Sequence, residues 1–499
     1  MKRTDDFRAG AISVALPTMV GMVVTYLYQV IDALWIARLG AGAPTAVVMA
    51  GAILALFLAL NDVAGIGSLP LFTQAYGAGD HEGTGALFRK AIVLKFHMGL
   101  LLGALYLLFL EKGLFLYTAN AEIAEPARRY GGLMALSIVL VMPYYTINTA
   151  LRVIGHARKT MITALCCSLV NILLDPLLIF GAGPGATLPA EFSRVGGRLL
   201  LGAGSPELFG HLSVPSMGVC GAALATVLSQ LAGLLVAGGL LARGGKGIRC
   251  FPRKVAELLP DPAFCRRTFA IGLPAGAMVI LFNLEQNLVV SLMEKYGTDA
   301  SDGFGIASRV RHLIFVATWG LSVGASISAG RLIGAGRHDE IRRGMGGLAL
   351  AAGLLLSVIA LPAFLFAREI LALFTPDSPA VVESGAMILR FFILISFLSC
   401  AALLRQAVFE GAGRNVPILK ANLLAILLLE MPLLVAVQRG FDLGIPYFMG
   451  GMLLGAAAQL LLMNHLFHTD RWEVNRRAVP KRPSSPPNTP PLRPLKEEA

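Results

Sequence analysis

Long uninterrupted runs of apolar residues recur along the whole chain and are separated by short polar connections. A helix needs about 20 residues to cross a hydrocarbon core of roughly 30 Å, and nearly all of these runs are at least that long. The pattern therefore predicts an all-α integral membrane protein with twelve transmembrane helices. The predicted spans are residues 9–37, 44–76, 86–110, 129–151, 159–181, 216–242, 267–295, 303–334, 346–367, 383–410, 415–438 and 443–467.

The charged residues support a membrane protein and indicate its orientation. Hydrophobic residues make up 56% of the chain and charged residues only 14%, whereas soluble domains carry roughly 25% charged residues. The net charge of +12 does not indicate a nucleic-acid partner, because the basic residues gather in alternate connections, beginning with Lys2, Arg3 and Arg8. By the positive-inside rule, we expect a multi-pass protein of the cytoplasmic (inner) membrane with both termini in the cytoplasm.

The second half of the chain repeats features of the first half. Corresponding positions lie 257 residues apart in the first spans and 256 residues apart near the ends of the two halves. The matching pairs are Pro17 and Pro274, Gly77 and Gly334, Gly79 and Gly336, His81 and His338, and Pro176 and Pro432. Because six is an even number, both halves enter the membrane from the same side. We therefore expect two pseudo-symmetric six-helix lobes with a cleft between them.

The expected organisation has two lobes, a loop and a tail. The first lobe covers residues 1–243 and includes a long extracytoplasmic connection, residues 182–215, which is rich in Gly, Pro and Ser. A cytoplasmic loop, residues 244–266, leads to the second lobe, residues 267–468. The basic, Pro-rich residues 469–499 are expected to form a disordered cytoplasmic tail.

An ionisable side chain interrupts the apolar run NILLDPLLIF, residues 171–180. A charge at the centre of a bilayer costs roughly 2.5–3.5 kcal/mol, so this carboxylate should face a cavity, hold a proton or have a partner. Asn171 and Asp175 are four residues apart and share one face of a helix. Pro176 cannot donate to the carbonyl of Ile172 and leaves that oxygen available. Such a set of hard oxygens suits a proton or Na⁺ rather than a soft metal.

The order of these motifs resembles the multidrug and toxic compound extrusion (MATE) transporters over roughly residues 9–467. The resemblance implies a V-shaped, two-lobe fold and cation-coupled efflux by a monomer. It is closest to the archaeal and DNA-damage-inducible bacterial branch, whose cation site matches Asp32, Asn171, Asp175 and Thr226. The residues that carry the resemblance are Pro17, 31–40, 74–80, 171–180, Gly218, 221–226 and 272–274.

The matched site is expected in the first half only. The carboxyl groups of Asp32 and Asp175 would converge, and two carboxylates in a low-dielectric setting do not ionise together easily, so one should hold a proton. Their counterparts in the second half are Val289 and Met431. Glu430 precedes Met431 and should point elsewhere, because a helix turns about 100° per residue, but a small shift in the register of the repeat would place an acid there. The alternative is a packing role, with a protonated Asp175 bonded to Asn171.

Other residues are candidates for substrate contact and for hinge bending. Pro17 and Pro176 are the candidate hinges, whose bend would change when the cation binds. Glu285 is a second acid that could serve the cation or the substrate, and Asp62 is either a cavity group or a packing contact. An apolar and aromatic surface could receive an organic cation, although such residues are also common in packing. The candidates for that surface are Tyr26, Tyr28, Trp35, Tyr145, Met278 and Phe282.

These observations predict a secondary active antiporter rather than an enzyme. It would export small, cationic, amphipathic organic compounds in exchange for H⁺ or Na⁺, and it would need no cofactor. Walker, GxGxxG, GxSxG and HExxH motifs are absent from the sequence. An alternative with the same fold is a flippase for lipid-linked oligosaccharides or peptidoglycan precursors. Its phosphate-bearing cargo would need basic residues in the cleft, and the intramembrane arginines are few, mainly Arg309, Arg311 and Arg390.

Overall fold

The computed structural model describes most of the chain as helices. The described residues are 5–40, 42–118, 120–181, 214–244, 250–251, 254–440, 443–469 and Trp472. Within them, twelve helices are long and apolar enough to cross a membrane, which confirms the predicted number of spans. Most of the 182–215 connection and nearly all of the predicted tail lie outside the described residues.

The first lobe contains six long helices. Their bounds are α1 (Asp5–Ala37), α2 (Gly42–Gly77), α3 (His81–Tyr117), α4 (Ala121–Val153), α5 (Ala157–Phe180) and α8 (Val219–Gly244). Both hinge candidates, Pro17 and Pro176, lie inside helices that continue through them.

The second lobe has the same number of spans, and one of them is irregular. The regular spans are α9 (Pro262–Met293), α10 (Thr298–Gly334), α11 (His338–Leu365), α13 (Pro379–Ala412) and α16 (Ile445–Thr469). The irregular span consists of α14 (Asn415–Leu423), the π-helical η3 (Leu424–Glu430), α15 (Met431–Val435) and the π-helical η4 (Ala436–Gly440). Three short helices complete the described part: η1 (Val255–Leu258), η2 (Glu294–Tyr296) and α12 (Ala367–Phe374).

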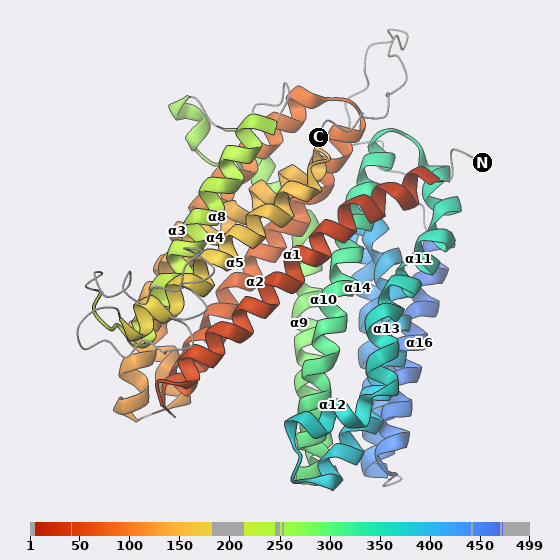
Figure 1. Cartoon of the computed structure of the whole chain (residues 1–499). Coiled ribbons are helices and arrows are strands. Elements are labelled where there is room, and N and C mark those ends of the chain that lie inside the picture. The colour runs from red at the N-terminus through yellow and green to blue at the C-terminus, as the bar shows by residue number, and fades with distance from the viewer. Residues whose placement is uncertain are drawn as a thin grey trace, which may run out of the picture.

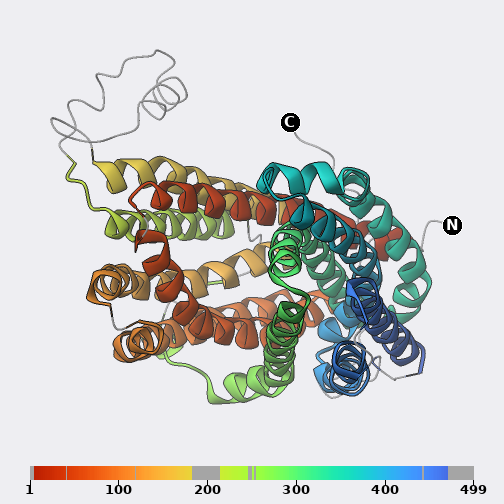
Figure 2. The same cartoon turned by 90° about the horizontal axis from the view of Figure 1, so that it is seen from below.

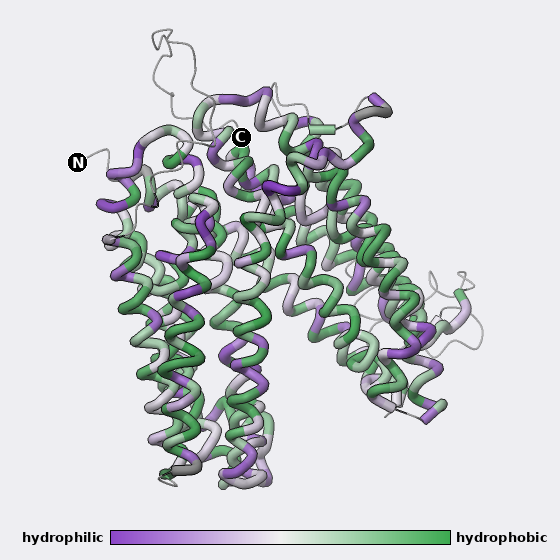
Figure 3. Tube along the Cα trace, turned by 180° about the vertical axis from the view of Figure 1, so that it is seen from behind, coloured by the Kyte–Doolittle hydropathy of each residue, from purple (hydrophilic) through white to green (hydrophobic). Residues whose placement is uncertain are grey.

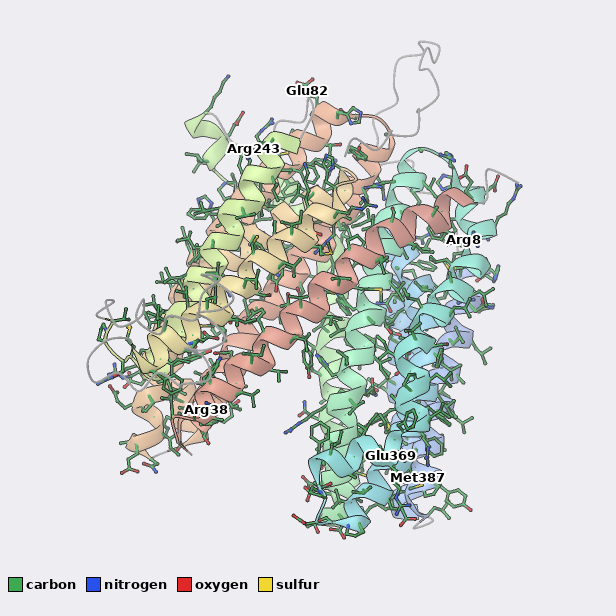
Figure 4. All side chains as sticks on the ribbon, in the orientation of Figure 1. Arg8, Arg38, Glu82, Arg243, Glu369 and Met387 are labelled. Atoms are coloured by element: carbon green, nitrogen blue, oxygen red, sulfur yellow. The ribbon has the colours of Figure 1, made fainter. Side chains whose placement is uncertain are left out.

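The two lobes form the V shape that was expected. They lie together at one end of the molecule and diverge towards the other (Figures 1 and 3). Arg8, Glu82 and Arg243 lie at the end where the lobes meet, which we call the closed end. Arg38 and Glu369 lie at the opposite, open end (Figure 4).

Helix α1 belongs to both lobes. Phe7, Ala11 and Met19, in its first half, are part of the hydrophobic core of the second lobe. Ile36, near its end, belongs to the core of the first lobe. Seen from below, α1 extends from one group of helices into the other (Figure 2). A change in the angle between the lobes therefore has to be accommodated along this helix.

Some helices begin or end beyond the predicted spans, because local signals outweigh hydropathy. Helix α9 begins at Pro262 rather than at residue 267, since the Asp261 carboxylate accepts a hydrogen bond from the Phe264 amide at 2.8 Å. A side-chain cap followed by proline is a strong helix start. Helix α3 continues to Tyr117, beyond the predicted 86–110 span, because Glu111 and Lys112 are compatible with a helix.

The closed end is held by direct contact between backbones, which we call the interlobe seam. A side chain at Gly67 of α2 would overlap the Thr268 carbonyl of α9, and one at Gly272 would overlap the Val63 carbonyl. The second half repeats this arrangement, because a Cβ at Gly324 of α10 would come within 2.8 Å of the Ala15 side chain of α1. Glycine at these positions lets the helices approach closely, as is common in membrane proteins.

Two hydrogen-bonding side chains cross the seam in a symmetric way. Gln74 of α2 donates to the carbonyl of Gly411 at 2.9 Å, at the end of α13. Its counterpart 257 residues later, Arg331 of α10, donates to the carbonyls of Arg152 and Val153 at the end of α4, both at 2.6 Å. Each lobe thus donates hydrogen bonds to main-chain carbonyls at a helix end of the other, where such carbonyls have acceptor capacity available.

Candidate functional site

Three of the four predicted cation-site residues meet inside the first lobe. Asp32 comes from α1, and Asn171 and Asp175 come from α5, where both are fully buried. The Asn171 amide donates to Asp175 Oδ1 at 3.3 Å. The carboxyl groups of Asp32 and Asp175 face each other within hydrogen-bonding reach. Residues 143 positions apart in the sequence therefore form one acidic cluster.

The cluster presents unsatisfied oxygen atoms. Asp32 Oδ1, Asn171 Oδ1 and Asp175 Oδ2 are buried and accept no hydrogen bond from any described residue. Leaving a buried acceptor unpaired costs about 1–3 kcal/mol. A bound proton or a small hard cation would satisfy these atoms, since carboxylate and amide oxygens are the ligands such cations prefer.

Two further residues complete the surroundings of this cluster. Thr226 of α8 is buried, but its hydroxyl donates to the carbonyl of Ala222 at 3.1 Å, one turn earlier in its own helix. Tyr130 of α4 lies close enough to interact electrostatically with both Asp32 and Asp175. Nothing in the sequence near Tyr130 distinguishes it from an ordinary packing residue, so it was not predicted.

A cavity of about 300 Å³ lies between the lobes. Its walls come from α1, α4, α5 and α8 of the first lobe and from α10 of the second. Among the sequence candidates, Tyr26, Tyr28, Tyr145 and Pro17 line it. The other lining residues are Thr18, Gly21, Met22, Thr25, Gln29, Val141, Tyr144, Asn148, Arg152, Thr160, Ala164, Cys167, Gln230, His312, Phe315, Val316 and Trp319.

Aromatic rings cover two sides of this cavity. On one side, the ring of His312 packs against Tyr26 with centroids 5.2 Å apart, and it continues through Phe315 to Trp319. On the other side, Tyr144 and Tyr145 pack together at 5.8 Å. The α10 rings were not predicted, because the sequence does not reveal which face of that span meets α1.

The remaining aromatic and sulfur candidates lie away from the cavity. Trp35 packs edge-on against Phe180 near the open end of α1. Met278 is buried in the second lobe, where its sulfur accepts a hydrogen bond from Asn422 at 3.4 Å. Phe282 packs against the core of that lobe. These three residues have packing contacts in this conformation, which was the alternative considered for them.

The second lobe contains its own acidic cluster, whose members the sequence did not bring together. Glu285 of α9 and Glu430 of η3 interact with each other electrostatically, and both interact with Arg311 of α10. The Arg311 guanidinium also lies 4.5 Å from the centre of the Phe392 ring. Glu430 is only 7% exposed, so its carboxylate lies inside the second lobe.

A local change of helix type explains the position of Glu430. The segment Leu424–Glu430 is a π-helix, which has more residues per turn than an α-helix, so the rule of 100° per residue fails there. Gly455 of α16 leaves room for the carboxylate, since a Cβ there would come within 2.5 Å of Glu430 Oε2. The second half thus buries an acid directly beside Met431, the counterpart of Asp175 in the repeat.

Asp62 belongs to a third polar group, formed by α2 and α3. Lys95 of α3 is 3% exposed, and its ammonium donates to Asn61 Oδ1 at 2.8 Å. Asn61 in turn donates to the carboxylate of Asp62 at 3.4 Å, and Lys95 also attracts that carboxylate. A buried lysine inside a membrane span is costly unless it is paired, and these partners provide the pairing.

Twelve spans in two related lobes, with a polar and aromatic cavity between them, define a two-lobe membrane transporter. Residues 17–177 and 274–435 match the MatE family model. The chain therefore belongs to the MatE family, as the sequence motifs suggested. The two matched segments begin at Pro17 and Pro274, the first pair of the internal repeat.

Curated relatives match most of the chain at low identity. A probable multidrug resistance protein, NorM, of Thermotoga maritima is 23% identical and covers 95% of this chain and 94% of its own length. The multidrug export protein MepA of Staphylococcus aureus is 22% identical, with 80% and 81% covered. A protein of Shewanella oneidensis described as an FAD transporter is 23% identical, with 85% and 86% covered.

Solved structures show the same fold. A MOP superfamily transporter from Pyrococcus furiosus aligns with a TM-score of 0.78 at 20% identity, covering 94% of this chain and 97% of that one. A MATE structure in the bent conformation aligns with a TM-score of 0.77 at 19% identity, with the same coverage of both chains. At this level of identity, the likeness concerns the arrangement of the helices alone.

Proposed function

We propose that this protein is a secondary active antiporter of the inner membrane, which exports small organic compounds with ring systems in exchange for H⁺ or Na⁺. The observation that carries the proposal is the buried cluster of Asp32, Asn171 and Asp175, in which one side-chain oxygen of each residue lacks a donor among the described residues. The family membership and the multidrug relatives support the transport of organic compounds. The basic connections support a cytoplasmic location for the closed end and both termini.

The position of the cluster suggests how an ion could influence the cargo. Asp32 lies on α1, one turn beyond Tyr28 and Gln29, which line the cavity. The first half of the same helix forms part of the seam with α10. Binding a proton or Na⁺ between α1 and α5 would favour one packing of α1, and the lobes would follow because α1 contacts both of them.

The flippase alternative receives less support from the structure. A cavity of about 300 Å³ is at the lower limit for a drug-sized ligand and is small for a lipid-linked saccharide. Among the arginines considered for it, Arg311 is occupied by two glutamates, and Arg390 lies 5.9 Å from the Phe364 ring.

The proposal is tested in proteoliposomes that contain the purified full chain. Efflux of rhodamine 6G, a cationic dye, and of fluorescein, an anionic dye, is measured under an imposed pH gradient and separately under a Na⁺ gradient. Wild type should move at least one dye faster with one gradient, and Asp175→Asn should abolish the dependence on that gradient. The exposed Asp377, between α12 and α13, provides the control Asp377→Asn, which should behave like wild type.

Two results would contradict the proposal. Gradient-driven efflux that persists in both Asp32→Asn and Asp175→Asn would show that the acidic cluster does not couple transport. Efflux that ignores both gradients in wild type would exclude antiport with these ions. The same comparison tests the cationic charge that the sequence suggests for the cargo: faster efflux of rhodamine 6G than of fluorescein would support it, and faster efflux of fluorescein would contradict it.

A further inference from the structure

The charges around the interlobe cavity are unlike those expected for a site that binds cations. Among the described residues that line it, none is an aspartate or a glutamate. Arg152, in the last turn of α4, is the one lining residue with a permanent charge. The aromatic walls offer stacking surface to a ligand of any charge, but the fixed charge in the cavity is positive.

Arg152 has hydrogen-bonding capacity available for a ligand. Its Nε atom is buried and has no acceptor among the described residues. Its main chain is held firmly, because its carbonyl accepts a hydrogen bond from Arg331 across the seam at 2.6 Å. A buried guanidinium donor without an acceptor is costly, and carboxylates and phosphates are the acceptors that match its geometry best.

A second side chain in the cavity also favours a ligand that accepts hydrogen bonds. The side-chain oxygen of Gln230 already accepts from the Ser137 hydroxyl at 2.7 Å, so its amide N–H groups are what it can offer a ligand. Asn148 offers little, because its side-chain oxygen accepts from the Thr163 hydroxyl at 2.7 Å and its amide donates to the Tyr144 carbonyl at 3.0 Å. Gln230 therefore adds donors to those of Arg152.

The acids nearest to this cavity have partners of their own. Asp62 interacts with Tyr145 from outside the lining, but Lys95 and Asn61 offset its charge. Asp32 interacts with Tyr28, but its carboxyl group faces Asp175 in the cation cluster. Neither acid occupies the cavity wall that Arg152 and the aromatic rings form.

We propose that the interlobe cavity binds aromatic organic anions, with a carboxylate or phosphate of the ligand on Arg152 and its ring system between Tyr145 and the rings of α10. The proposal rests on the proposed function only in treating this ligand as the cargo. It departs from the cationic cargo expected from the sequence. It also makes Arg152 a specificity-determining residue, because its side chain selects the charge of the ligand.

The test measures equilibrium binding to the purified full chain without any ion gradient. Fluorescein and rhodamine 6G share a xanthene ring system but carry opposite charges, and fluorescence polarisation at pH 8 reports the affinity for each. Wild type should bind fluorescein more tightly. Arg152→Gln should weaken fluorescein binding by about tenfold or more, because a charged hydrogen-bonding partner is lost. Rhodamine 6G binding should not weaken.

Two further variants separate a specific role from general damage. Arg158→Gln removes an exposed arginine from the first turn of α5, outside the cavity, and should leave both affinities unchanged. Arg152→Lys keeps the positive charge and should recover part of the fluorescein affinity. Thermal unfolding of each variant shows whether it is folded.

The proposal can also be tested on wild type alone, so that the result does not depend on whether a variant folds. Salicylate, an aromatic anion, should displace fluorescein at concentrations at which the neutral salicylamide does not. Tighter binding of rhodamine 6G, equal displacement by both competitors, or unchanged fluorescein binding in a folded Arg152→Gln would each overturn the proposal. Fluorescein binding without gradient-driven efflux would instead count against the antiport function and leave this inference standing.

Discussion

Arg311 of α10 lies inside the second lobe between two acids from different helices. Glu285 and Glu430 both attract it, and its guanidinium also lies over the Phe392 ring. Removing one member of a buried group of opposite charges destabilises the fold, because the remaining charges then lie out of water without a partner. The burial of two glutamates close together therefore depends on Arg311.

We expect Arg311→Gln to destabilise the protein by on the order of 3–5 kcal/mol, since it leaves two buried acids without a positive partner. Glu430→Gln should restore part of the loss when it is added to Arg311→Gln. Thermal unfolding of the two single variants and the double variant measures this coupling. Additive losses would show that the two side chains do not interact.

The described helices show which features can be read from a sequence and which cannot. Hydropathy and residue spacing predict the number of spans, the repeat and the α5 pair of Asn171 and Asp175. All three can be read directly from the order of residues along the chain. The position of Glu430 does not, since it depends on a π-helix that forms in the packed lobe. The position of Arg152 in the cavity wall was also missed, because its neighbours there come from distant helices.

The start of helix α9 depends on the side chain of Asp261. Asp261 caps this helix and also pairs with Lys90 of α3 at 2.6 Å. It therefore connects the loop between the two lobes, residues 244–266, to the first lobe. The hydrogen bond from Lys90 holds the pKa of Asp261 below its ordinary value. Removing the cap in Asp261→Ala should cost about 1 kcal/mol, and the partly exposed pair adds little.

The pH dependence of this effect follows from the direction of the pKa shift. A lowered pKa in the folded state means that the stabilisation is complete above about pH 4, the ordinary pKa of aspartate, and declines as the pH falls further. The difference in melting temperature between wild type and Asp261→Ala should be constant from pH 7 to 5 and shrink below pH 4. Lys90→Met should reduce that dependence, and a difference that grows on acidification would contradict the assignment.

The close contacts of the interlobe seam hold the two lobes together at the closed end of the molecule. Gly67→Ala places a methyl group against the Thr268 carbonyl, where there is no space for it. We expect this variant to favour a state in which the lobes separate at the closed end and approach each other at the open end. Spin labels at Arg38 and Glu369, one on each lobe, should then report shorter distances by electron resonance.

Gly353 of α11 provides the control for that experiment, because a Cβ at this position meets nothing within 4 Å. Gly353→Ala should leave the distance distribution between Arg38 and Glu369 as in wild type. An unchanged distribution in a folded Gly67→Ala would mean that the seam does not limit the movement of the lobes.

The way in which the interlobe seam is packed has a consequence for its opening. Two side chains cross it and fit against glycines, Val63 against Gly276 and Met19 against Gly320, so each can withdraw from a surface that carries no side chain of its own. The hydrogen bonds of Gln74 and Arg331 end on main-chain oxygens, which water can satisfy as soon as the lobes separate. Opening of the closed end therefore requires the release of these hydrogen bonds together with the withdrawal of Val63 and Met19 from the glycines opposite them.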